Sequence, residues 1–481
     1  MRFRRSKHNL SHYVPLTCDM GQLVPVSCVE VIPGDTFRHQ TSALVRVSPL
    51  VAPVMHPVEV RLHHWFVPNR LLWSSWEDFI TGGSDGNDSS TIPTVAHTAT
   101  PANEPLLDYL GVPPVANLSG INALPIRAYN KIFNEFYRDQ DLVTARSEDA
   151  LTLAKIAWEK DYFTTARPWT QKGTEVSLPL GTSANIHASA DVADEIGIYS
   201  DHAAGYRMLD ANNARVDISS TSTGAEGNKL YANLTTATAA TINDLRLAFA
   251  TQNYQELRAR YGSNYVDYLA YLGIHSQDAR LQRPEYLGGG KQTLSFSEVL
   301  QTAPENASSS NVGDFGGHGI AAMRSNQYQR FFQEHGWVMT MMSVRPKSMY
   351  NDGLHRKFSR TEKEDYYQRE LELIGQQEVL NQEVYASHTT PGGTFGYSDR
   401  YGEYRSEPSR VAGDFRVGDS LDHWHMARGF TSDPALNATF VECTPTKRIH
   451  QDTSGSTIWA MVNHRLAARR LVRRNPQPAI L

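Results

Sequence analysis

VEVRLHHWFVPNRLLW, residues 58 to 73, shows the most regular two-residue alternation in the chain. One set of alternate residues is almost entirely apolar: Val58, Val60, Leu62, His64 and Phe66. The residues between them mix charge with aromatic rings. Because side chains alternate between the two faces of a strand, this pattern predicts an antiparallel strand with one face on a core and the other partly covered. Pro68 ends the strand because it has no N–H to donate.

A short helix is predicted directly after this strand. Ser74 and Glu77 have the spacing of a capping box, in which each side chain accepts a backbone N–H at the start of a helix. Gly82 and Gly83 follow one or two turns later and can end the helix.

Other strands are predicted early and late in the chain, at residues 41–51, 336–346, 439–442 and 457–462. Between them we expect a Gly/Ser/Asn-rich loop at 302–327 and helices at 241–262, 263–273 and 366–375. Strands far apart in the sequence must then pair, and the regular strand–helix alternation of a parallel fold is missing. The sequence therefore predicts a mainly β fold, an antiparallel jelly-roll sandwich with long loop and helical insertions.

Residues 128–172 form the densest aromatic and basic stretch. Tyr129, Ile132 and Phe133 fall at helical spacing, which predicts an amphipathic helix with its apolar face buried. The alternative is a surface on which single-stranded bases stack, since lysines and arginines are interspersed. Core packing is the favoured interpretation.

Residues 182–241 have a different composition from the rest of the chain. Thirty-five of these 60 residues are Thr, Ala, Ser, Asn or Gly, and seven acidic residues against three basic ones give a charge of −4. A segment with so few large apolar side chains cannot bury a core of its own. We therefore expect an exposed insertion.

The two ends of the chain are basic, although the net charge is −5. Residues 12–464 carry −14, because all charged residues of the two ends are basic: Arg2, Arg4, Arg5, Lys7, Arg465, Arg469, Arg470, Arg473 and Arg474. Basic ends on an acidic body suggest contact with a polyanion, so these nine residues are the candidate nucleic-acid-binding set. The alternative is that both ends are simply solvated.

Catalytic motifs are weak. His423 and His425 would lie on one face of a strand, as a jelly-roll metal enzyme requires, but no further ligand is evident. Gly288-Gly289-Gly290-Lys291 lacks the other residues of a phosphate-binding loop. The three cysteines, Cys18, Cys28 and Cys443, have no metal-binding spacing. No enzyme, no metal and no cofactor is predicted, and no apolar run is long enough to span a membrane.

Several blocks resemble, in the same order, the major capsid proteins of the microviruses, tailless single-stranded DNA bacteriophages, and most closely their gokushovirus branch. Among these blocks are HHWFVPNRLLWSSWEDF, LPIRAYNKIFNEFYRDQD, DARLQRPEYLGGG and FGYSDRYGEYRSEPSRVAGDFR. The resemblance covers most of the chain outside the loops. The C-terminal RLAARRLVRRNPQPAIL is more basic than the family pattern.

The resemblance implies one jelly-roll domain of eight strands over residues 1–481, with a basic arm at 1–15 and a basic tail at 465–481. Sixty copies would form a T=1 icosahedral shell, the capsid of the virion, around a circular single-stranded DNA genome. Residues 182–241 occupy the place of the family's threefold protrusion, which meets the host surface. The family also implies a DNA pilot protein, an internal scaffolding protein, a host receptor and assembly in the bacterial cytoplasm.

Charge arithmetic predicts one more partner. Sixty copies of the nine terminal charges supply at most about 540 positive charges, whereas single-stranded DNA carries roughly one negative charge per nucleotide. A genome of a few thousand nucleotides would stay mostly unneutralised, so a small, very basic DNA-packaging protein is expected. The alternatives to a shell are a metal enzyme that uses His423 and His425, and a monomeric carbohydrate-binding β-sandwich.

Overall fold

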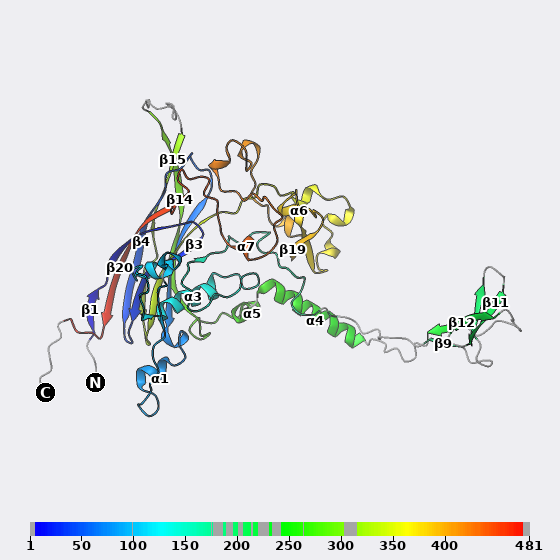
Figure 1. Ribbon diagram of the computed structural model, residues 1–481, viewed down its shortest axis with the longest axis horizontal. Helices are drawn as coiled ribbons and strands as arrows, with labels where there is room; N and C mark the ends of the chain where they lie inside the picture. Colours follow the sequence, from blue (N-terminus) through cyan, green and yellow to red (C-terminus); the bar gives the residue numbers. More distant parts are fainter. Residues whose placement is uncertain are drawn as a thin grey trace. The chain divides into compact units, whose positions relative to one another are not determined.

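The computed structural model describes residues 5–98, 100–174, 176, 242–262, 264–302 and 315–474, together with five short strands between residues 186 and 232 (Figure 1). The chain divides into two compact units. The first contains Met1–Thr170 and Arg258–Leu481, and the second contains Gln171–Leu257.

Eight long antiparallel strands of the first unit form two sets of four. The first set has the order β2 (His12–Cys18), β20 (Ile458–Arg470), β4 (Thr36–Val47) and β15 (Phe315–Arg324). The second set has the order β3 (Gln22–Val31), β17 (Gly336–Pro346), β5 (Val58–Pro68) and β14 (Glu285–Leu300). The long strand β14 joins the sets, because its first part pairs with β5 and its last part with β15. Distant strands therefore pair, as the sequence predicts.

Short strands extend these two sets. β1 (Ser6–Asn9) pairs with β20, and β16 (Tyr328–Phe331) pairs with β4. β8 (Ala154–Lys155) pairs with β3. We call β1, β2, β4, β15, β16 and β20 the open sheet, and β3, β5, β8, β14 and β17 the covered sheet.

The two sheets pack face to face around one apolar core. The predicted inward residues of β5 are all buried, and Val58, Val60 and Leu62 have no exposed surface. They share a core cluster with Val45 of β4 and Val462 of β20. The strands predicted at 58–68, 41–51, 336–346 and 457–462 are confirmed, although β4 ends at Val47 and β20 continues to Arg470.

The second face of the covered sheet is buried under helix α3 (Leu124–Phe136) and neighbouring loops. Tyr129 is fully buried, and its hydroxyl donates to the Leu23 carbonyl at 2.7 Å and accepts the Ala154 N–H at 2.9 Å. Phe133 packs in the same cluster. Core packing is therefore the correct interpretation of these rings, and base stacking by them is wrong.

A polar layer crosses the interior of the sandwich. His39 of β4 and His464 of β20 lie at hydrogen-bond distance, with 3.2 Å between Nε2 and Nδ1. His64 of β5 contacts the Thr340 hydroxyl at 2.9 Å and the Ser325 hydroxyl at 3.1 Å. Burial is the main cause that lowers the pKa of all three histidines from 6.5 to about 3.

The remaining elements of the first unit are short. The helices are α1 (Trp76–Thr81), α2 (Pro105–Tyr109), α5 (Tyr265–Tyr271), α6 (Asn381–Val384) and α7 (Ala438–Val441). The two-stranded pairs are β6 (Thr94–Val95) with β7 (Ile121–Asn122), and β18 (Gln376–Leu380) with β19 (Thr394–Asp399). Helix α4 (Ile242–Tyr261) crosses the boundary between the units and confirms the helix predicted there. Among the described helices, none is long and apolar enough to cross a membrane.

The second unit contains a three-stranded antiparallel sheet and one strand pair. The sheet consists of β10 (Ile196–Ser200), β11 (Gly205–Asn212) and β12 (Arg215–Ser219), and the pair consists of β9 (Ile186–Ala188) and β13 (Leu230–Ala232). We expect residues 182–241 to form an exposed insertion, but their side chains lie outside the described part of the chain.

Four local predictions are wrong. Helix α1 begins after Ser75 without a side-chain cap, so Ser74 and Glu77 form no capping box, although Gly82 does end the helix with φ 86°. The expected loop at 302–327 contains strand β15. The expected helix at 366–375 is reduced to a 3₁₀ turn at Arg369–Leu371. The expected strand at 439–442 is helix α7, because the Asn437 side chain accepts the Phe440 N–H and caps it.

Candidate nucleic-acid interface

The outward face of the open sheet has an unusual charge composition. The six strands of this sheet contain no aspartate or glutamate, in a chain with 51 acidic residues. Alternation sends the apolar side chains of β4 and β20 into the core and leaves six basic side chains exposed on the outward face: Lys7, Arg38, Arg46, Arg324, Arg465 and Arg469. Arg330 of β16 is exposed as well, but it lies opposite the buried Phe37 and pairs with Glu285. We call this surface the basic face.

Strand pairing brings five of these residues around one groove. Lys7 of β1 lies opposite Arg469 of β20, and Arg38 of β4 lies opposite Ala467. The groove has a volume of about 660 Å³ and is lined by Lys7, Arg38, Arg324, Arg465 and Arg469. No ion pair to a carboxylate is recorded for any of the five among the described residues, so their charges are free to attract an anion.

Neutral hydrogen bonds orient the groove's side chains. The Arg324 guanidinium donates to Gln40 Oε1 at 2.6 Å, which holds it against β4. Arg5 lies just outside the groove, where it donates to the Gly34 carbonyl at 3.0 Å and to the Thr36 hydroxyl at 2.9 Å. An arginine held by neutral partners keeps its charge available for a phosphate.

The structure places the nine basic residues predicted to bind nucleic acid in different surroundings. Lys7, Arg465 and Arg469 lie together on the basic face. Arg470 points to the opposite side and pairs with the buried carboxylate of Asp35 at 2.9 Å. Arg5 borders the groove, Arg473 and Arg474 are exposed beyond the end of β20, and Arg2 and Arg4 lie outside the described residues.

The expected terminal arm and tail are partly regular structure. Residues 6–9 and 12–15 belong to β1 and β2, and residues 465–470 belong to β20. Lys7, Arg465, Arg469 and Arg470 are therefore fixed on a sheet. The sequence did not assign Arg38, Arg46 and Arg324 to the interface, because each stands between uncharged neighbours in the sequence. The sequence signal that could have identified them is the absence of aspartate and glutamate from the strands that form the open sheet.

The histidines of the predicted metal site do not share a face. Asp422–Trp424 form a 3₁₀ turn, so the expected strand is absent there. His425 is buried, and its Nδ1 accepts the Ala427 N–H at 3.0 Å. Burial is also the main cause that lowers the pKa of His425. In the part of the chain that the structure describes, no three His, Cys, Asp or Glu side chains are placed to hold a metal ion.

Comparison with known proteins identifies the class. The family described as "Capsid protein (F protein)" matches residues 1–460, and the chain belongs to this family. Capsid protein VP1 of Bdellovibrio phage phiMH2K is 38% identical over 480 residues, covering 92% of this chain and 89% of that protein. Capsid protein VP1 of Chlamydia phage 1 is 33% identical over 92% of this chain and 90% of that protein. Capsid protein VP1 of Spiroplasma virus 4 is 29% identical over 91% of this chain and 87% of that protein.

The resemblance to microvirus major capsid proteins is thereby confirmed. The protein is a structural component of the virion and assembles in many copies. It is not an enzyme, so the metal-enzyme alternative is wrong, as is a free carbohydrate-binding sandwich.

Proposed function

We propose that this chain builds a T=1 icosahedral shell of sixty copies whose basic face is turned toward a circular single-stranded DNA genome. The observation that carries the proposal is the basic face itself, six exposed basic side chains on a sheet whose strands contain no acidic residue. The chain as a whole has a net charge of −5, so this separation of charge gives the subunit one side suited to DNA.

The strand order supports an eight-stranded jelly roll. The orders β2-β20-β4-β15 and β3-β17-β5-β14 interleave early and late strands in the way that two Greek keys do. Such a sandwich is rigid, and its long connections are free to fit neighbouring copies around fivefold, threefold and twofold axes.

Charge arithmetic again supports a small basic DNA-packaging protein. Sixty copies of the six residues of the basic face supply about 360 positive charges, fewer than a genome of a few thousand nucleotides requires. A DNA pilot protein and an internal scaffolding protein, with assembly in the host bacterial cytoplasm, complete the proposal.

The test of the DNA-facing surface is a charge variant with a matched control. Replacing Lys7, Arg465 and Arg469 with glutamine should reduce the slope of log affinity against log salt by about 2 for single-stranded DNA, because three phosphate contacts are lost. The control replaces three exposed basic residues outside the open sheet, Lys291, Lys363 and Arg369, with glutamine. If the two variants showed equal slopes of log affinity against log salt, the basic face would not be the surface that binds DNA.

We further propose that residues 182–241 are the surface projection that attaches the particle to its host. None of the eight long strands comes from this segment, which lies within the second unit. Replacing it with a short Gly/Ser bridge should leave shell formation intact in electron micrographs and abolish adsorption to host cells. A deletion chain that does not fold, or particles that still adsorb, would contradict this role.

A further inference from the structure

The basic face has an apolar end that the phosphate-binding groove does not explain. Trp459 and Met461 of β20 are 46% and 48% exposed, and Leu44 of β4 is 40% exposed. Met461 lies directly opposite Leu44, and Trp459 lies opposite Arg46. A second groove of about 930 Å³ includes all four side chains in its lining, together with residues of β2, β3 and α2, among them Asp108.

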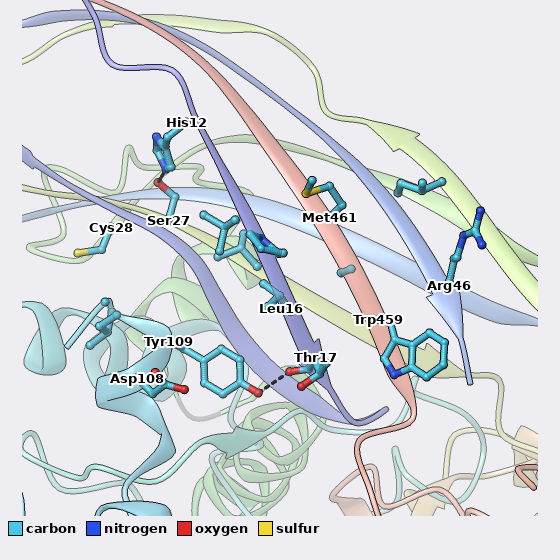
Figure 2. A pocket seen from close by; sticks show the side chains of 17 residues that line it. His12, Leu16, Thr17, Ser27, Cys28, Arg46, Asp108, Tyr109, Trp459 and Met461 are labelled. Atoms are coloured by element: carbon cyan, nitrogen blue, oxygen red, sulfur yellow. Dashed lines mark hydrogen bonds between the residues drawn. The ribbon is translucent and has the colours of Figure 1, made fainter. Parts of the chain in front are cut away.

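Figure 2 shows how these side chains are placed. Trp459 and Arg46 lie next to each other on adjacent strands, and Met461 follows farther along β20. Thr17 and Pro15 of β2 lie opposite Trp459 and Met461, so the indole and the thioether stand among small neighbours. A flat aromatic ring is therefore accessible from the outside of the sheet.

The apolar end continues directly into the basic groove. Met461 and Arg465 are four residues apart on one strand, which corresponds to about 13 Å. Arg46 makes no recorded ion pair among the described residues, and the strands around it contain no acidic residue. An exposed ring that continues into a row of unpaired cations fits a chain that carries both flat apolar groups and negative charges.

We propose that Trp459, Met461 and Leu44 form a base-stacking site for single-stranded DNA, and that Arg46 and Arg465 bind the phosphates on either side of the stacked base. This inference rests on the proposed function, because it assigns the bases of the same DNA strand to a second part of the basic face. An aromatic platform beside a cationic groove binds single strands with little sequence preference. A protein occupant is less well supported, because Asp108 is the only carboxylate among the described residues that line this groove and the strands of the open sheet offer none to pair with basic groups of a partner.

The first experiment is photocrosslinking in intact particles. Particles grown with bromodeoxyuridine in the genome are irradiated, and crosslinked peptides are mapped by mass spectrometry. The expected result is a crosslink on the peptide that contains Trp459, together with crosslinks in the basic groove. Crosslinks in the groove without any at Trp459 overturn the stacking site but leave the proposed function intact. Crosslinks at neither place count against both.

The second experiment separates stacking from packing. In the full-length chain, Trp459→Leu should weaken binding of a thymidine oligonucleotide about tenfold at every salt concentration, whereas Trp459→Phe should keep most of the affinity. Phe358→Leu, at a ring that is 64% exposed away from the open sheet, is the matched control. A loss that is equal for Trp459→Leu and Trp459→Phe, or one that disappears at high salt, overturns the proposal.

The third experiment tests for a protein occupant. Hydroxyl-radical oxidation of Trp459 and Met461 should be low in DNA-filled particles and several-fold higher in empty ones, since the DNA is what covers them. Equal protection in both kinds of particle would mean that another protein surface covers this end, and it would overturn the inference.

Discussion

Strands β17 and β20 lie in opposite sheets of one sandwich, yet their outward faces differ completely. In β17 every residue from Val338 to Val344 is buried, and Met339 and Met341 are at most 1% exposed. In β20 burial alternates, and Met461 is 48% exposed. The same residue type thus serves as core in one sheet and as surface in the other. The difference is made by α3 and its loops, which cover one sheet and leave the other available to a partner.

The largest expected effect is that of acid, which should lower the free energy of unfolding through the buried histidines between the two sheets. His39, His64 and His464 have folded pKa values of about 3, whereas the unfolded chain has the ordinary value of about 6.5. The unfolded state therefore binds more protons below pH 6.5, and the stability present above that pH is lost as the pH falls. At pH 5 the loss is about 2 kcal/mol per histidine, or about 6 kcal/mol for the three.

Urea unfolding of the full-length chain at pH 7.5 and pH 5 measures this loss. The groups that face the three histidines are His12, His63 and the Tyr328 hydroxyl, so the described surroundings supply no carboxylate to offset protonation. The variant His64→Gln should reduce the acid loss by about 2 kcal/mol. The control His275→Gln, at an exposed position, should not change it. Identical acid profiles for the two variants would show that the polar layer does not control the response.

A pair of methionine substitutions sharpens the comparison of the two strands. Met339→Ala should lower the free energy of unfolding by about 3 kcal/mol, because it leaves a cavity between β17 and α3. Met461→Ala should change it by less than about 0.5 kcal/mol, because the side chain is half exposed. Urea unfolding of both variants is the measurement. Similar losses would mean that the open sheet is also covered within the subunit.

The smallest expected effect comes from one new carboxylate. Asn463→Asp places a negative charge on the basic face, two residues from Arg465 and directly opposite Ser42 of β4. DNA affinity should fall by about fivefold at low salt and recover as salt screens the repulsion, with stability unchanged. The matched change Asn103→Asp, at an exposed position before α2, tests whether any added charge has this effect. A salt-independent loss would point to misfolding instead.

The sequence reveals the faces of strands well, because alternation records which side meets water. It predicts β4, β5, β17 and the buried face of α3. It does not predict β15, whose Phe315–Arg324 run is rich in glycine and resembles a loop. Those glycines are required by packing: a Cβ at Gly319 would lie 2.8 Å from Val47 and Leu294 side-chain atoms, and one at Gly317 would lie 2.5 Å from the Ala52 carbonyl oxygen.

The sequence by itself also determined the family, the acidic body and the basic chain ends. Only the tertiary structure decided which charges act together. Lys7 and Arg469 come from opposite ends of the chain and become neighbours through the pairing of β1 with β20, whereas Arg470 turns inward to Asp35. Neighbouring residues of a strand point to opposite faces, so the surface that meets DNA depends on strand partners that no local pattern specifies.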